Sequence, residues 1–216
     1  MIQQMLRAVT GQHHLIGMDL GEYRKMNISG MTFQVYAFYA EGLGRVSAMT
    51  ASGFLGLMKM DTLIINPTDV DLPLLSYDRV HAMGNDTLIY ELYDTNLGTP
   101  DLAALDAVRD AAKDLPDHDL GEHWYDSIKL RQSLSKKGKK AHKEAFDKTA
   151  MGYLQAYLNL AGTAQPCDPN RKMEKASVYV EGLLKNGGPS TDVFKKGLGE
   201  EKTGDLFRRI LFGTEI

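Results

Sequence analysis

Five short strand-like segments, separated by turns of a few residues, constrain the fold of this chain more than any other feature. They are rich in β-branched and aromatic residues and occupy residues 32–40, 45–50, 60–66, 72–80 and 87–94. The turns between them, among them EGLG, NPTD and MGND, are too short for the crossover that joins parallel strands. Residues 32–94 therefore predict one antiparallel sheet of about five or six strands in near-sequential order.

Helices are expected to cover both faces of this sheet. Runs such as LIIN and LIYELY are apolar at odd and even positions alike, which is typical of a sheet without a wet side. Apolar residues then recur at helical spacing, and an aspartate followed by proline marks a further helix start. The predicted helices are 102–115, 142–162, one from Asp168 to a stop at Gly187, and two short ones at DVFKKGL and DLFRRILF. The pattern predicts a three-layer α/β/α sandwich of the α+β type with a central antiparallel sheet, formed by residues 1–216 as one domain.

Composition narrows the function mainly by exclusion. The net charge of −3 gives no reason to expect nucleic acid as a partner, because such binding relies on neutralised phosphates. The lone cysteine, Cys167, cannot form an internal disulfide or a Cys-rich metal site. No phosphate-binding loop, dinucleotide fingerprint, GxSxG elbow or paired metal-binding histidines occur, so we expect no metal. No run is long enough for a membrane span, and we expect a soluble, cytoplasmic protein without a membrane partner.

A basic run lies between two of the predicted helices. SKKGKKAHK, residues 135–143, contains Lys136, Lys137, Lys139 and Lys140, and its glycine predicts a loop. Such a run is most often a solvated surface. The functional alternative is a docking patch for an acidic partner.

Two aspartates stand inside apolar strand segments. By strand alternation, Asp61 shares a face with Leu63 and Ile65, and Asp78 shares a face with apolar residues of its own strand. An unpaired carboxylate among apolar side chains holds its proton, because burial disfavours the charged form. A protonated aspartate near neutral pH is a proton donor. The alternative is that both aspartates lie at strand ends, capping turns or pairing with Lys59 and Arg79.

Several motifs around and beyond these aspartates carry a resemblance to a known family. They are DLPL at 71–74 followed by Asp78, MDTLIINP at 60–67, GP at 188–189, VFKKGLGEE at 193–201 and RRILFG at 208–213. In these pieces the chain resembles the ferredoxin-dependent bilin reductases and the related red chlorophyll catabolite reductases. The matching pieces lie in the two ends of the domain. The chain is also short for this family.

The resemblance implies a function, a partner and a mechanism. A linear tetrapyrrole such as biliverdin would lie between the sheet and the C-terminal helices, and Asp78 would protonate it. Asp61 falls where the phycocyanobilin-forming members carry a second catalytic residue, a histidine, and would assist as donor or relay. No cofactor would be permanently bound, since electrons arrive singly from ferredoxin or flavodoxin, docked at the basic run. Arg45, Lys59 and Arg79 are conceivable partners of the propionates and stay unassigned.

Two departures from the family pattern leave other functions open. Asp61 is not histidine, and Gly188 stands where many members carry an aspartate before the proline. A non-catalytic tetrapyrrole-binding or carrier protein is therefore one alternative. A structural or regulatory domain that shares only the fold is another.

Overall fold

The structure, a computed structural model that describes residues 1–215, contains one sheet of eight antiparallel strands. The strands follow one another in the order β1-β3-β4-β5-β6-β7-β8. Both β1 and β2 pair with the outer edge of β3, β1 at its C-terminal end and β2 at its N-terminal end. The five strands from β3 to β7 are consecutive in the sequence and form the centre of the sheet. This confirms the predicted antiparallel sheet in near-sequential order. The strands are β1 (Leu15–Gly17), β2 (Lys25–Ile28), β3 (Met31–Ala40), β4 (Gly44–Gly53), β5 (Met58–Asn66), β6 (Leu74–Ala82), β7 (Asn85–Tyr93) and β8 (Leu134–Lys139).

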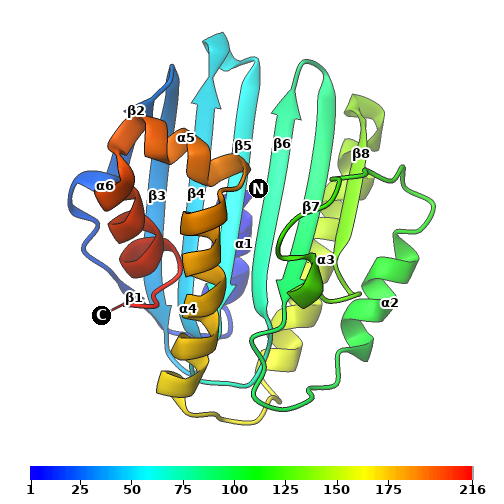
Figure 1. Ribbon diagram of the computed structural model, residues 1–216. Coiled ribbons are helices and arrows are strands. Elements are labelled where there is room, and N and C mark those ends of the chain that lie inside the picture. The colour runs from blue at the N-terminus through cyan, green and yellow to red at the C-terminus, as the bar shows by residue number, and fades with distance from the viewer. Residues whose placement is uncertain (216) are drawn as a thin grey trace.

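Helices lie on both faces of the sheet, which confirms the predicted three-layer sandwich (Figure 1). The C-terminal helices cover one face, while α1 and α3 lie behind the other and α2 packs beside α3. The bounds are α1 (Ile2–Thr10), α2 (Ala103–Ala111), α3 (Lys143–Ala161), α4 (Pro169–Asn186), α5 (Pro189–Leu198), α6 (Glu200–Asp205) and a π-helical segment, Leu206–Leu211, that continues α6. Short 3-10 turns occupy Gly21–Arg24, Phe54–Gly56, Asp126–Ile128 and Lys140–His142. Within residues 1–215, no helix combines the length and the apolar character that a membrane crossing requires.

Alternating side chains build two separate cores from the same strands. On β5, Leu63 and Ile65 pack toward α1 and α3, whereas Ile64 packs toward α4 and the C-terminal segment. All three side chains are at most 5 % exposed, which explains why both parities of this strand are apolar. As predicted, the Asp168 carboxylate caps α4 by accepting hydrogen bonds from the backbone N–H groups of Asn170 and Arg171.

The basic run was wrongly predicted to be a loop. Residues 134–139 form the edge strand β8, which pairs with β7 from Asn85↔Lys139 to Tyr90↔Leu134, and a 3-10 turn follows. Lysines and a glycine have weak strand propensity, but pairing with a buried neighbour overrides it, and lysine is common on edge strands. The alternation of a strand also divides the lysines between two faces.

Candidate functional site

A cavity lies between the sheet and the C-terminal helices, and its empty volume including the opening is about 990 Å³. Strands β4 to β7 form its floor, α4, α5 and the C-terminal segment form its roof, and the connection between α2 and β8 closes one side. The roof is largely apolar. Its aliphatic and aromatic members are Tyr179, Leu183, Phe194, Phe207, Leu211 and Phe212. Such a mainly apolar, partly open hollow with a few polar groups is typical of a site for an organic ligand.

Asp78 lies on the floor of this cavity, directly across from Thr62 on β5. The Thr62 hydroxyl donates a 2.5 Å hydrogen bond to its carboxylate. Burial raises the pKa of Asp78 from 3.8 to about 6, opposed by the Thr62 hydrogen bond and reinforced by the nearby charge of Glu91. The carboxyl can therefore hold or release a proton close to neutral pH.

The structure does not bring Asp61 to the same site. In the register of β5 and β6, Asp61 lies across from Arg79, and the next pair is Thr62↔Asp78. Because neighbouring residues of a strand point to opposite faces, the Asp61 side chain lies on the face of the sheet opposite to Asp78. There its carboxylate lies 3.5 Å from the amino group of Met1. The expectation that both aspartates meet one ligand is wrong, because a shift of one residue in register moves a side chain to the other face. The neighbour of Asp78 is Thr62, whose hydroxyl does not titrate in the physiological range.

Glu91 is the second carboxylate of the cavity, and the sequence analysis missed it. It lies on β7 across from Ser76, two residues along β6 from Asp78. Its carboxylate accepts a 2.7 Å hydrogen bond from the Tyr93 hydroxyl and lies 3.7 Å from the Lys129 amine. The available signal was the one used for Asp78, namely a charged residue inside the apolar run LIYELY.

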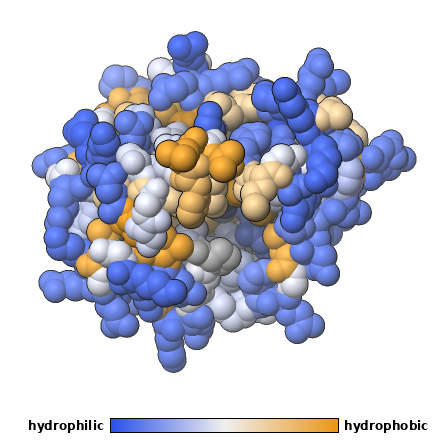
Figure 2. All heavy atoms as spheres, turned by 90° about the horizontal axis from the view of Figure 1, so that it is seen from above, coloured by the Kyte–Doolittle hydropathy of each residue, from blue (hydrophilic) through white to orange (hydrophobic). Residues whose placement is uncertain are grey.

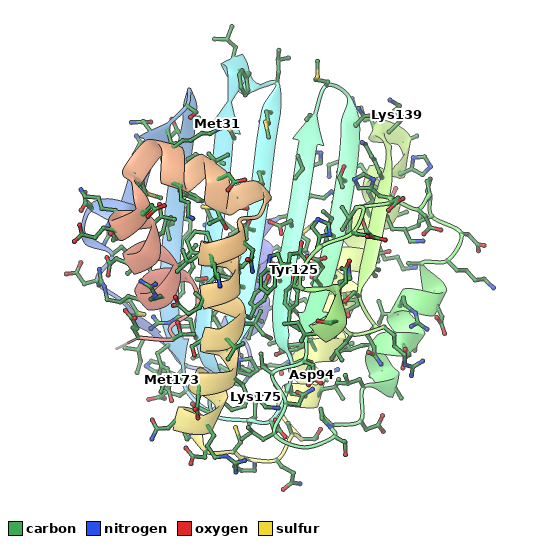
Figure 3. All side chains as sticks on the ribbon, in the orientation of Figure 1. Met31, Asp94, Tyr125, Lys139, Met173 and Lys175 are labelled. Atoms are coloured by element: carbon green, nitrogen blue, oxygen red, sulfur yellow. The ribbon has the colours of Figure 1, made fainter. Side chains whose placement is uncertain are left out.

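Aromatic side chains form one wall of the cavity. Tyr93 stacks on Tyr179 of α4 at 4.1 Å between ring centroids, and Tyr125 meets Tyr93 edge-on at 5.5 Å. His123 stacks on Tyr125 at 4.8 Å, and among the described residues its buried Nδ1 has no hydrogen-bond partner. Figure 3 shows Tyr125 over the middle of the sheet. Burial raises the pKa of Tyr125, so its hydroxyl stays a neutral hydrogen-bond donor.

A glycine on α4 positions this aromatic wall. The Trp124 ring packs so closely on Gly182 that a side-chain carbon there would overlap it. The indole N–H also donates to the Gly187 carbonyl at 3.3 Å. His123, Trp124 and Tyr125 lie in an irregular connection, where no periodic pattern in the sequence marks them.

The three conceivable propionate partners do not line the cavity. Arg79 is buried on the opposite face in a two-point ion pair with Asp86, and Lys59 lies on that same opposite face of β5. Arg45 lies beside Gly213 rather than in the cavity, and burial together with the charge of Arg209 lowers its pKa to about 10. Among residues 1–215, no lysine or arginine lines this space. Gly188, which departs from the family pattern, does line it.

Only part of the predicted basic patch is available to a partner. Lys136 is 5 % exposed, and its amine donates to Asp117 at 2.6 Å and to the Leu115 carbonyl at 3.0 Å. It therefore holds the connection after α2 against β8. Lys137, Lys139 and Lys140 are exposed.

Comparisons with known proteins identify the fold. No protein-family model and no curated sequence matches the chain. Among solved structures, the chain is similar to selenomethionine phytochromobilin synthase from tomato, crystallised in complex with biliverdin, with a TM-score of 0.80. The match covers 99 % of this chain and 82 % of that one at 16 % sequence identity, so it shows a shared fold.

Proposed function

We propose that this protein binds a linear tetrapyrrole of the biliverdin type in the cavity and reduces it, with Asp78 as the proton donor. The observation that carries the proposal is the carboxyl of Asp78, with its pKa raised to about 6, on the floor of a large, mainly apolar cavity. Support comes from the fold shared with a protein crystallised with biliverdin and from the motif DLPL before Asp78.

The proposed step couples one proton to one electron. Asp78 donates its proton to a carbonyl oxygen or pyrrole nitrogen of the bilin, which makes the conjugated system easier to reduce. An electron from ferredoxin or flavodoxin then gives a neutral radical. A second electron, with a second proton that Asp78 takes up from solvent and passes on, completes the reduction of one double bond. The chain needs no permanently bound cofactor in this scheme, because the electron donor supplies both electrons.

The environment of Asp78 suits this role. With a pKa of about 6, the carboxyl of Asp78 exchanges its proton close to neutral pH. A bilin that displaces water from the cavity raises the protonated fraction. Glu91, rather than Asp61, is the second carboxylate of the cavity, and its charge is among the causes that raise the pKa of Asp78.

The electron donor is proposed to dock at the edge strand β8. Lys137, Lys139 and Lys140 are exposed there and would attract an acidic ferredoxin or flavodoxin. Lys136 is excluded from this patch because its amine is held by Asp117.

Absorption spectra of the purified protein mixed with biliverdin test the proposal. We expect a shifted and sharpened bilin spectrum on binding, and a further change when a low-potential one-electron donor is supplied. Binding without reduction would assign the chain to the carrier class, which the non-titrating Thr62 beside Asp78 favours. No binding at micromolar concentration would leave a structural or regulatory domain that shares only the fold.

A further inference from the structure

One end of the sheet carries an exposed apolar group that the fold does not use. The β4–β5 and β6–β7 hairpins end side by side, because β5 and β6 pair from Met58↔Ala82 onward. Their turns present four apolar side chains, here called the tip patch: Phe54, Leu55, Leu57 and Met83, which are 60, 105, 69 and 89 % exposed. Figure 2, which views this end from above, shows apolar atoms gathered at its centre and surrounded by hydrophilic ones.

The backbone at these positions is also unfavourable for the residues it carries. Phe54, Leu55 and Met83 have φ angles of 51°, 55° and 52°, the left-handed region in which glycine, asparagine and aspartate are common and bulky residues are strained. The side chains of Leu55 and Met83 are 105 and 89 % exposed, so they bury little surface that could offset this strain. Strain of this kind at exposed apolar side chains points to a role outside the chain.

The charge around the tip patch is positive. None of the residues 54–57 and 83–84 is acidic. Lys59 is exposed two residues after Leu57, and the Lys139 amine reaches Asn85 Oδ1, beside the β6–β7 turn, at 2.6 Å. Figure 3 shows Lys139 at this end of the molecule. Lys139 thus borders both this patch and the edge proposed for the electron donor.

We infer that this end of the sheet is a peripheral contact surface for a bilayer that contains anionic lipids. Projecting hairpin tips with aliphatic side chains can enter the boundary between head groups and acyl chains, while lysines around them remain level with the phosphates. Lys59 and Lys139 at the border of the patch complement anionic head groups, which is why we assign the patch to a bilayer rather than to a protein partner. The earlier expectation of no membrane partner rested on the lack of a spanning segment, which such a contact does not require.

The contact would also orient the cavity. Met60 and Val80 line it and lie three residues along the chain from Leu57 and Met83. A bilayer at the tips therefore lies close to this end of the cavity. The inference does not depend on the proposed reduction, since it rests on the surface alone.

Vesicle flotation with the full chain tests the inference. Vesicles of phosphatidylcholine alone are compared with vesicles that also contain phosphatidylserine, using the wild type and the double variant Leu55→Asn/Met83→Asn. Asparagine tolerates the left-handed backbone, so the double variant should fold at least as well as the wild type. The control is Val178→Asn, which changes an exposed apolar residue on α4, outside the tip patch.

We expect the wild type and the Val178 variant to float with the phosphatidylserine vesicles, less so at high salt. The double variant should bind about tenfold more weakly or worse, because two large apolar side chains no longer leave water. Equal binding of the double variant and the wild type, or no flotation of the wild type, would overturn the inference. Self-association of the wild type that the double variant abolishes, without lipid binding, would assign the patch to a second copy and would equally overturn it.

Discussion

Replacing Asp78 by asparagine should stabilise the protein above neutral pH. The folded chain holds the Asp78 proton with a pKa of about 6, compared with 3.8 when the carboxyl is free in water. Between these two values the folded state binds more protons than the unfolded state, so the free energy of unfolding falls as the pH rises. Above about pH 6 the full destabilisation caused by the buried charge of Asp78 is present, and below about pH 4 it is absent.

The size of the effect follows from the same two values. A difference of about 2 pH units at about 1.4 kcal/mol each amounts to at most about 3 kcal/mol. Asparagine keeps the shape of the side chain and can still accept the hydrogen bond from Thr62, but it carries no charge. For a chain of this length, the melting temperature of Asp78→Asn at pH 8 should therefore exceed that of the wild type by up to about 6 to 12 °C.

Thermal melts of both proteins from pH 4 to pH 8 measure this effect. The difference in melting temperature should grow with pH up to about pH 6 or 7 and then level off. Asp114→Asn, at an exposed position after α2, is the control and should show no such rise. A variant that is less stable than the wild type at pH 8 would refute the reasoning and would make Asp78 a structural residue that caps or pairs.

Three further predictions concern the surroundings of the site. Thr62→Val removes a hydrogen bond that lowers the pKa of Asp78, and Glu91→Gln removes a charge that raises this pKa. In a plot of single-turnover rate against pH, the midpoint should therefore move to higher pH in Thr62→Val and to lower pH in Glu91→Gln. Shifts in the same direction would contradict this. Gly182→Ala should displace Trp124, change the fluorescence emission of this single tryptophan and weaken bilin binding. The control is Gly152→Ala on α3, where a side-chain carbon has room, and it should leave emission and binding unchanged. Unchanged emission in Gly182→Ala would show that the aromatic wall accommodates the added carbon without moving Trp124. Replacing Lys137, Lys139 and Lys140 by glutamine should slow electron transfer from ferredoxin at low salt, to the rate that the wild type shows at high salt. Lys136→Gln should mainly lower the melting temperature. Unaltered transfer in the triple variant would show that β8 is an ordinary solvated edge strand.

The sequence predicted the architecture well because the two periodicities that define it are strong. The turns between β3 and β7 are too short for the crossover that parallel strands need, so these strands must pair antiparallel. The Asp168 and Pro169 pair marks the start of α4. The edge strand β8 was missed because its lysines and glycine carry no strand signal of their own. Its pairing with β7 determines its structure, and the paired residues lie 44 to 54 positions apart in the sequence.

The site was predictable only in part. The burial of Asp78 follows from its place in an apolar strand, but its neighbour depends on the register between β5 and β6, which the sequence of each strand does not reveal. In the observed register, Thr62 and not Asp61 lies opposite Asp78 and beside it in the cavity. His123 and Tyr125 lie in an irregular connection, where side-chain position depends on tertiary contacts such as Trp124 against Gly182.

The central claim is that Asp78 supplies a proton to a bound bilin, and a single-turnover experiment on Asp78→Asn tests it most directly. The variant and the wild type are loaded with biliverdin, supplied with reduced ferredoxin, and followed by absorption and electron paramagnetic resonance. Asparagine keeps the shape of the site but cannot donate an acidic proton, so the variant should bind bilin nearly as tightly, accept one electron, and then stall as a long-lived radical. The step that needs the proton should slow by about 10² to 10⁴-fold, the usual contribution of a general acid. A variant that reduces biliverdin at the wild-type rate per folded molecule would contradict the assignment of Asp78.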